Sequence, residues 1–116
     1  MGISRLGLSG STRGAPILIT STSSATANII HTALSSTGST SWDEIHLGAF
    51  NNSTGAINLT IEYGSPSVII RQSVPSASGV VQVLPGSIGN GGLIIKAFKG
   101  GAGEVGVVGI INRFTP

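Results

Sequence analysis

The stretch AINLTIEY, residues 56–63, alternates apolar and polar side chains along its length. Successive side chains of an extended strand point to opposite sides, so the apolar positions share one face and the polar positions share the other. This period of two predicts a β-strand with one buried and one solvent-facing side. The predicted buried side consists of Ile57, Leu59, Ile61 and Tyr63.

On both sides of this strand the chain consists of short apolar runs separated by turn signals. The sequence NNSTG at 51–55 and the Pro-Gly pair at 85–86 mark two of the turns. No helical spacing of apolar residues continues for three turns without a glycine, so no helix is predicted. A polar turn is expected over 35–41 and a glycine loop over 86–92. Eight strands are expected, over 17–21, 27–34, 43–50, 56–63, 67–74, 79–84, 93–98 and 104–114.

Eight short, evenly spaced strands are typical of an all-β sandwich or barrel. At 116 residues the chain has the length of one domain. We therefore expect a single-domain, jelly-roll-like β-sandwich of about eight antiparallel strands over residues 17–116. Residues 1–16 are rich in glycine and serine, and we expect them to form an extended N-terminal arm that docks on a neighbouring subunit.

Charged residues make up only 9% of the chain, against roughly a quarter in an ordinary soluble domain. Soluble proteins usually rely on mixed surface charge, so this composition favours a structural protein that is covered by partners in an assembly. The six Lys and Arg residues are scattered and the net charge is +2, which argues against nucleic acid as a partner. No apolar run approaches the length of a membrane helix, so no membrane partner is expected either.

Several predicted strands are apolar on both faces, notably Val68–Ile70 and Val107–Ile111. A two-layer sandwich buries only one face of each strand, so the second apolar face predicts contact with another chain. We expect a homo-oligomer, with a trimer favoured over a dimer. The predicted interface residues are Arg5, Leu6, Leu8, Arg13, Trp42, Val68, Ile70, Val108, Ile110 and Arg113.

The residues that could carry acid–base or metal chemistry are few. A site made of two histidines and one carboxylate is conceivable from His31, His46 and Glu44, because Glu44 and His46 share a strand face and His31 could lie across from His46. Spacing alone does not support such a site. We therefore expect these residues and Asp43 to be surface or interface polar groups.

Other chemical motifs are missing or incomplete. Residues 101–106 fit the letters G-x-G-x-x-G, but a β-branched strand follows them where a dinucleotide site needs a helix. No nucleophile elbow is present. We predict no catalytic, cofactor-binding or metal-binding residues, no cofactor, and no enzyme activity. If the protein instead binds carbohydrate, Trp42 is the aromatic residue expected to contact the sugar.

The block WDEIHLGAFNN at 42–52 and the segment LTIEYG at 59–64 resemble small all-β virion proteins of tailed bacteriophages. Those proteins carry a D-E-[IV]-x-L-x-A-x-N strand followed by an L-T-I-E-x-G strand. VLPG at 83–86, NGGL at 90–93, KAF at 96–98 and residues 109–114 also match that pattern. The resemblance covers residues 27–114 and implies a capsid decoration (cement) protein or a related head or tail component.

The sequence as a whole is interpreted as a structural virion protein that decorates and stabilises a phage capsid by bridging major capsid subunits. Its expected location is the capsid surface, after synthesis in the host cytoplasm. Two alternatives remain open, a tail or connector component and a carbohydrate-binding module for host attachment. Sequence alone leaves the oligomeric state, the host and the capsid axis undetermined.

Overall fold

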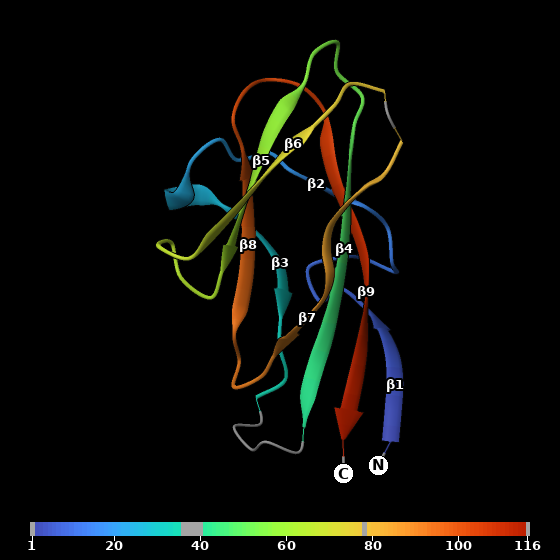
Figure 1. Ribbon diagram of the computed structural model, residues 1–116. Coiled ribbons are helices and arrows are strands. Elements are labelled where there is room, and N and C mark those ends of the chain that lie inside the picture. Colours follow the sequence, from blue (N-terminus) through green and yellow to red (C-terminus); the bar gives the residue numbers. More distant parts are fainter. Residues whose placement is uncertain (1, 36–40, 78, 116) are drawn as a thin grey trace.

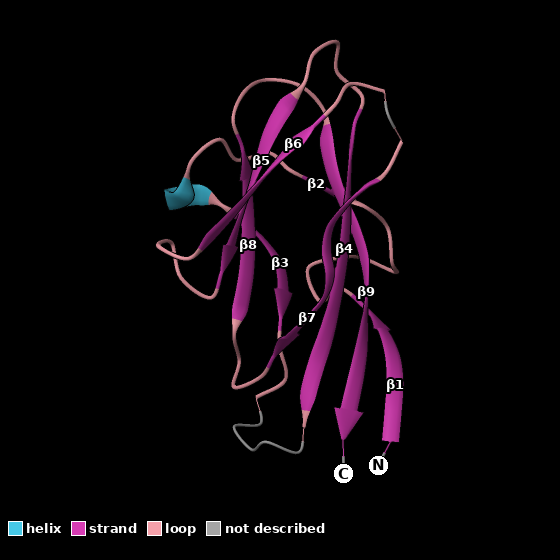
Figure 2. Cartoon of the chain, in the orientation of Figure 1, coloured by secondary structure: helices cyan, strands magenta, loops and turns pink. Residues whose placement is uncertain are grey.

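The computed structural model describes residues 2–35, 41–77 and 79–115, and these form two stacked layers of β-strands (Figures 1 and 2). The predicted polar turn over 35–41 lies outside the described residues except at its two ends. Within them, one short 3-10 helix, η1 (Ser24–Thr26), accompanies nine strands. The strands are β1 (Gly2–Gly7), β2 (Ile17–Leu18), β3 (Asn28–Thr32), β4 (Trp42–Asn51), β5 (Ile57–Tyr63), β6 (Ile69–Val74), β7 (Val81–Gly89), β8 (Ile94–Lys99) and β9 (Val105–Thr115).

The strands form two antiparallel sheets, which confirms the all-β, two-sheet prediction. Sheet A has the order β1-β9-β4-β7, with β2 also paired to β9. Sheet B has the order β3-β8-β5-β6. From β2 onward, every connection crosses from one sheet to the other except the turn between β5 and β6.

The hydrophobic core lies between the inner faces of the two sheets. On β4 the odd-numbered residues are buried and the even-numbered ones are partly exposed, as expected of a strand in one layer of a sandwich. The predicted buried side of β5 is confirmed for Ile57, Leu59 and Ile61, and Tyr63 packs against the core from its edge. All eight predicted strands are present, and the core takes side chains from both sheets.

Residues 2–7 are extended, as expected of the N-terminal arm, and they form the edge strand of sheet A. β1 pairs with β9 in an unbroken register from Gly2–Thr115 to Gly7–Ile110. β2 continues the same line further along β9, and residues 8–16 form a loop between them. Because backbone pairing needs no large side chains, this glycine-containing segment joins the sheet, and residues 2–7 belong to sheet A of the same chain.

β7 continues through Pro85 and Gly86, where sequence analysis predicted its end. Proline lacks an N–H donor, but β7 is an edge strand with one unpaired side, where proline is tolerated. Gly86 has a φ of 117°, and the β4–β7 register shifts between Ile45 and His46 on the partner strand. The glycine loop is therefore shorter than predicted and is confined to a turn closed by the hydrogen bond from the Leu93 N–H to the Asn90 carbonyl, 3.2 Å.

The second side of β5 is solvent-facing at Asn58, as predicted, but Thr60 and Glu62 on the same side are buried, in contrast to the prediction. Thr60 and Glu62 are 6% and 3% exposed. The segment containing η1 covers this side of sheet B, and the Ser24 hydroxyl donates a hydrogen bond to the Glu62 carboxylate. The alternation of residues along a strand shows which residues share a face. It does not show whether a loop from elsewhere in the chain covers the polar face.

Candidate interaction face

The outer face of sheet A collects the outward-pointing residues of β1, β9, β4 and β7. The β4–β9 register pairs Trp42 with Phe114, Glu44 with Asn112, His46 with Ile110 and Gly48 with Val108. We call this surface the striped face, because apolar positions lie on both sides of a polar row. Its members are Ile3, Arg5, Trp42, Glu44, His46, Gly48, Phe50, Val80, Gln82, Pro85, Ile88, Val108, Ile110, Asn112 and Phe114.

At one end of the striped face, aromatic and aliphatic side chains lie side by side. The rings of Trp42 and Phe114 stack with centroids 5.2 Å apart and an interplanar angle of 22°. Ile3 pairs with Phe114 on the next strand and is 65% exposed. Aromatic pairs of this kind contribute area and fixed geometry to an interface.

A polar row crosses the middle of the face. The Arg5 guanidinium donates to the Asn112 side chain at 3.4 Å, and the Asn112 amide donates to the Glu44 carboxylate at 3.2 Å. His46 Nε2 lies 2.7 Å from the same Glu44 oxygen. The hydrogen bonds from His46 and Asn112 lower the pKa of Glu44, so its carboxylate is charged at neutral pH. The row is therefore a prearranged set of charges between two apolar regions.

Beyond the polar row, a shallow hollow of about 390 Å³ opens between β7, β4 and β9. Val80, Val108 and Ile110 line it, and Val80 is 61% exposed. Gly48 forms part of its floor, where a Cβ would overlap the Val80 side chain. The hollow is an exposed apolar patch, and such patches commonly mark interaction sites.

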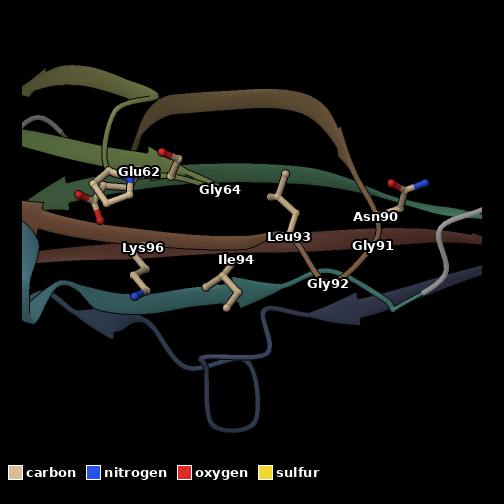
Figure 3. A pocket seen from close by; sticks show the side chains of 10 residues that line it. Glu62, Gly64, Asn90, Gly91, Gly92, Leu93, Ile94 and Lys96 are labelled. Carbon is tan, nitrogen blue, oxygen red and sulfur yellow. The ribbon is translucent and has the colours of Figure 1, made fainter.

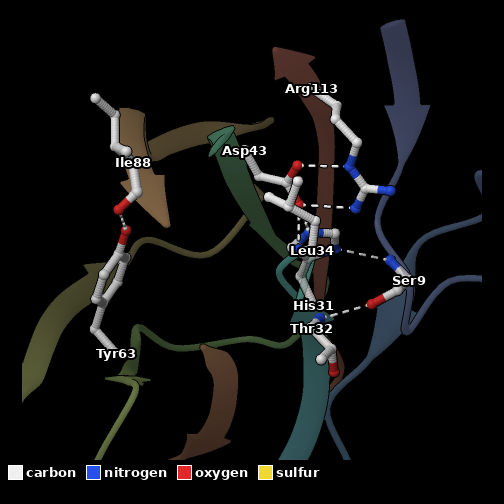
Figure 4. A network of polar contacts seen from close by, with 8 residues as sticks. All are labelled: Ser9, His31, Thr32, Leu34, Asp43, Tyr63, Ile88 and Arg113. Carbon is white, nitrogen blue, oxygen red and sulfur yellow. Dashed lines mark hydrogen bonds and ion pairs between the residues drawn. The ribbon is translucent and has the colours of Figure 1, made fainter. Parts of the chain in front are cut away.

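A second polar network lies inside the molecule, at the end of sheet A where β3 passes β4 (Figure 4). Asp43, whose side chain is fully buried, accepts from Arg113 Nε at 2.7 Å and from Arg113 Nη2 at 3.0 Å. It also accepts from the Leu34 N–H at 3.2 Å. Burial would raise the pKa of Asp43, but the hydrogen bonds from Arg113 and His31 outweigh burial and lower it. The hydrogen bond to Asp43 raises the pKa of Arg113.

His31 joins this network and has a defined tautomer. Its Nδ1 accepts from the Ser9 N–H at 3.1 Å, so the ring proton is on Nε2, which lies 2.9 Å from Asp43 Oδ2. Asp43 and His31 are therefore core groups, and the expectation that they are surface or interface residues is wrong. Nor does His31 lie across from His46, because β3 belongs to sheet B and β4 to sheet A. The four residues form two separate pairs.

Sheet B carries a different hollow, of about 350 Å³, beside the turn between β7 and β8. Figure 3 shows Glu62 and Lys96 toward one end of it and Asn90 toward the other, with Leu93 between them. At the same end of the molecule the Tyr63 hydroxyl donates to the Ile88 carbonyl at 2.6 Å and links the two sheets (Figure 4). Burial raises the pKa of Tyr63, so the hydroxyl keeps its proton.

The structure brings four of the ten predicted interface residues together on the striped face: Arg5, Trp42, Val108 and Ile110. Leu8 belongs to the hydrophobic core and has no surface to offer a partner, because the loop after β1 turns its side chain inward. Arg113 is turned inward to Asp43.

The remaining four predicted residues lie elsewhere. Leu6 is on the opposite side of β1 from Arg5, and Arg13 is in the loop before β2. Val68 is exposed beside β6, and Ile70 packs against the core.

The predicted interface residues did not include several other members of the striped face, namely Ile3, Gly48, Phe50, Val80, Ile88, Asn112 and Phe114. Phe50 and Phe114 carried a signal, since they are among the few aromatic residues in the chain. Ile3, Ile88 and Asn112 become neighbours of Trp42 and Glu44 through strand pairing between distant segments, which the order of residues does not show.

Comparison with protein-family models, with curated proteins and with solved structures gave no match to this chain. Among the described residues, no three His, Cys, Asp or Glu side chains gather in a way that would hold a metal ion. The same residues contain no helix of the length and apolarity needed to span a membrane.

Proposed function

We propose that this chain is a structural virion protein that decorates a phage capsid and bridges neighbouring major capsid subunits through the striped face. The observation that carries the proposal is the outward display of Trp42, Phe114, Val108 and Ile110 on one side of a sheet whose other side forms the core. Only 9% of the residues are charged, so little surface charge compensates for this apolar face in water. Burial of the face against a partner removes apolar surface from water and is therefore favourable.

The size of the striped face supports this role. Ten paired positions along β4 and β9, at about 3.3 Å each, and four strands, at about 4.8 Å each, span roughly 630 Å². This is near the share of about 800 Å² that each partner contributes to a standard interface. The binding free energy of one such contact is modest once the entropy cost of association is subtracted. Many copies of the contact around a capsid shell together give strong attachment.

The polar row supports specific rather than general adhesion. Arg5, Asn112 and Glu44 are held by one another before any partner arrives. Fixed charges inside an apolar contact restrict its register, because a mismatched partner leaves them buried without a counter-charge. The proposed action therefore depends on shape and surface complementarity, and we propose no enzyme activity and no cofactor.

The strand order supports the finer proposal that the sandwich is a jelly roll. With β1 and β2 counted as one strand along β9, sheet A has the order 1-9-4-7 and sheet B the order 3-8-5-6. The chain alternates between the sheets at nearly every connection, as in a double Greek key. We further propose that the protein assembles as a homo-oligomer on the capsid, with a trimer favoured over a dimer.

Co-sedimentation with capsids assembled from the major capsid protein of the same genome tests the proposal. The wild-type protein should pellet with mature capsids in a saturable manner. Val108→Asp places a charge in the proposed contact and should abolish pelleting, whereas Ile29→Asp on the outer face of sheet B should leave it unchanged. Absence of saturable binding by the wild type would overturn the proposal, and binding to tails alone would favour a tail or connector component.

One observation favours carbohydrate binding as a second candidate function. The partly exposed Trp42–Phe114 stack lies beside the Glu44 and Asn112 side chains, and aromatic rings with adjacent hydrogen-bonding groups are suited to sugars. A glycan array with wild type and Trp42→Ala separates the two functions. Glycan binding that is lost in Trp42→Ala, together with no capsid binding, would favour the carbohydrate-binding module.

A further inference from the structure

The loop between β1 and β2 borders an open surface hollow of about 610 Å³ against the end of β9. Arg13 and Arg113 both line it, together with Ser9, Ser11 and His31. We call it the arginine hollow. It adjoins the apolar hollow of the striped face at Gly14, which lines both, but its own Arg113 and His31 point to the inner side of their sheets.

The loop that forms one wall is fixed in place by hydrogen bonds to β3. The Gly10 N–H donates to the Ile30 carbonyl at 3.0 Å, and the Ser9 N–H donates to His31 at 3.1 Å. The Thr32 N–H donates to the Ser9 hydroxyl at 2.7 Å. A Cβ at Gly10 would overlap the Ile29 carbonyl, so the close approach requires glycine. The arginine hollow is therefore a built part of the fold.

Arg13 occupies a backbone position that is unfavourable for it. Its φ is 55°, in the left-handed region that favours glycine or asparagine, and Gly14 follows with a φ of 77°. The turn geometry alone does not explain an arginine at this position. Ala77 occupies the same region with a φ of 52°, so the significance of Arg13 rests on its side chain, which lines the hollow.

The charges around the hollow leave one positive charge without a counter-charge. Arg113 is neutralised by Asp43, and the third guanidinium nitrogen points away from that carboxylate, toward the side where Ser9 lies (Figure 4). Because His31 Nδ1 accepts the Ser9 N–H, the ring presents its Nε2 proton to Asp43. The other three acids are elsewhere, with Glu44 on the striped face, Glu62 under η1 and Glu104 bonded to Asn52. Arg13 has no acidic partner among the described residues.

We propose that the arginine hollow binds an acidic side chain of a neighbouring protein subunit. The net charge of +1 from Arg13, Arg113 and Asp43 matches a single carboxylate, and guanidinium groups bind carboxylates through paired N–H donors. The proposal rests on the proposed function, because it assigns the capsid subunit as the source of the carboxylate. It gives the decoration protein a second, polar attachment point beside the apolar striped face.

Titration of the ¹⁵N-labelled protein with N-acetyl-glutamate amide at constant ionic strength tests the site. The amide signals of Ser9, Ser11 and Gly14 should shift saturably with a Kd on the order of 10 mM. The uncharged analogue N-acetyl-glutamine amide should cause no saturable shift. Arg13→Gln should weaken binding about tenfold without changing the unfolding midpoint. Arg71→Gln, an equally exposed arginine on β6, is the matched control and should bind as the wild type does.

Equal binding by Arg13→Gln and the wild type, or equal shifts with the glutamine analogue, would overturn the site. Capsid co-sedimentation of Arg13→Gln then tests the partner. Weaker pelleting than Arg71→Gln supports the assignment, and equal pelleting overturns it. The proposed carboxylate site and the proposed capsid decoration can be disproved independently. The glutamate titration tests the site without any capsid, and pelleting of the wild-type protein tests capsid decoration without reference to the site.

Discussion

Asp43 and Glu44 are neighbours in the sequence and have opposite environments. Strand alternation turns Asp43 inward to Arg113 and His31, and it turns Glu44 outward to Asn112 and His46. The inner carboxylate holds the fold together, and the outer one belongs to a surface. We therefore expect substitution of Asp43 to lower the stability of the fold and substitution of Glu44 to alter the surface.

Asp43→Asn leaves Arg113 partly buried without its counter-charge, and we expect a loss of about 3 kcal/mol in the free energy of unfolding at pH 7. The folded-state pKa of Asp43 is lowered, so its stabilisation is complete above the unfolded-state value of about 4 and is lost as pH falls toward the folded-state value. Urea unfolding from pH 7 to 2 should show the wild type and the variant converging at low pH. Parallel curves would contradict the assignment.

The two histidines should differ in their effect on stability. His31→Ala removes hydrogen bonds to Ser9 and Asp43 and opens a cavity in a site that is 1% exposed, so we expect a loss of about 3 kcal/mol. His46→Ala removes one exposed pair with Glu44 and should cost no more than about 0.5 kcal/mol. Urea unfolding of both variants measures these losses from the shift in midpoint, provided that the m-values equal that of the wild type. Similar losses for the two variants would show that the inner network contributes no more than the surface pair.

At the scale of elements, the strands with strong apolar character were predictable, and their boundaries depended on tertiary context. β4, β5 and β9 carry β-branched or alternating sequences and were predicted within a few residues. β1 was not predicted as a strand, because it is a fully exposed edge whose partner β9 lies about a hundred residues away. The extension of β7 past Pro85 likewise depends on its edge position in the sheet.

Removal of β1 alone should be tolerated. A variant lacking residues 2–7 loses six paired positions with β9 but keeps Leu8 in the core. The lost hydrogen bonds are largely offset by the conformational entropy that six ordered residues cost, so we expect native circular dichroism and a net loss of about 1 kcal/mol. Leu8→Ala in the full chain should cost more, about 3 kcal/mol, because it empties core volume. The shortened variant should also bind capsids more weakly, since Ile3 and Arg5 are lost from the striped face. Unfolding of the shortened chain would show that β1 is required for the sheet.

At the scale of the whole molecule, the all-β class followed from the strand count and the lack of helical periodicity. The assignment of strands to sheets did not, because it depends on pairings between distant segments. The striped face was predictable only in part for the same reason. Single outward residues such as Trp42 and Ile110 were identified from the sequence, but the strand pairing that places them on one face was not. The partners of Arg113 and His31 were missed for this reason as well.

In free solution, where no capsid subunit covers the striped face, self-association is expected to depend on it. Ile110→Asp should shift the protein toward monomer in light scattering at micromolar concentration, because an unpaired charge in a buried contact costs several kcal/mol. Val68→Asp, beside β6 and outside the striped face, provides a comparison. The sheet content of both variants should equal that of the wild type. A wild-type protein that is monomeric at this concentration and binds no partner would contradict the prediction.

The position of β9 has a consequence for biosynthesis. It is the last strand in the described chain, and it pairs with β1, β2 and β4 at the centre of sheet A. During translation, the earlier strands emerge from the ribosome while their central partner is still unmade, so sheet A completes only after residue 115 leaves the exit tunnel. Such long-range pairing folds slowly and leaves apolar strands exposed to aggregation in the interval. A chaperone that binds the nascent chain during this interval would protect these strands.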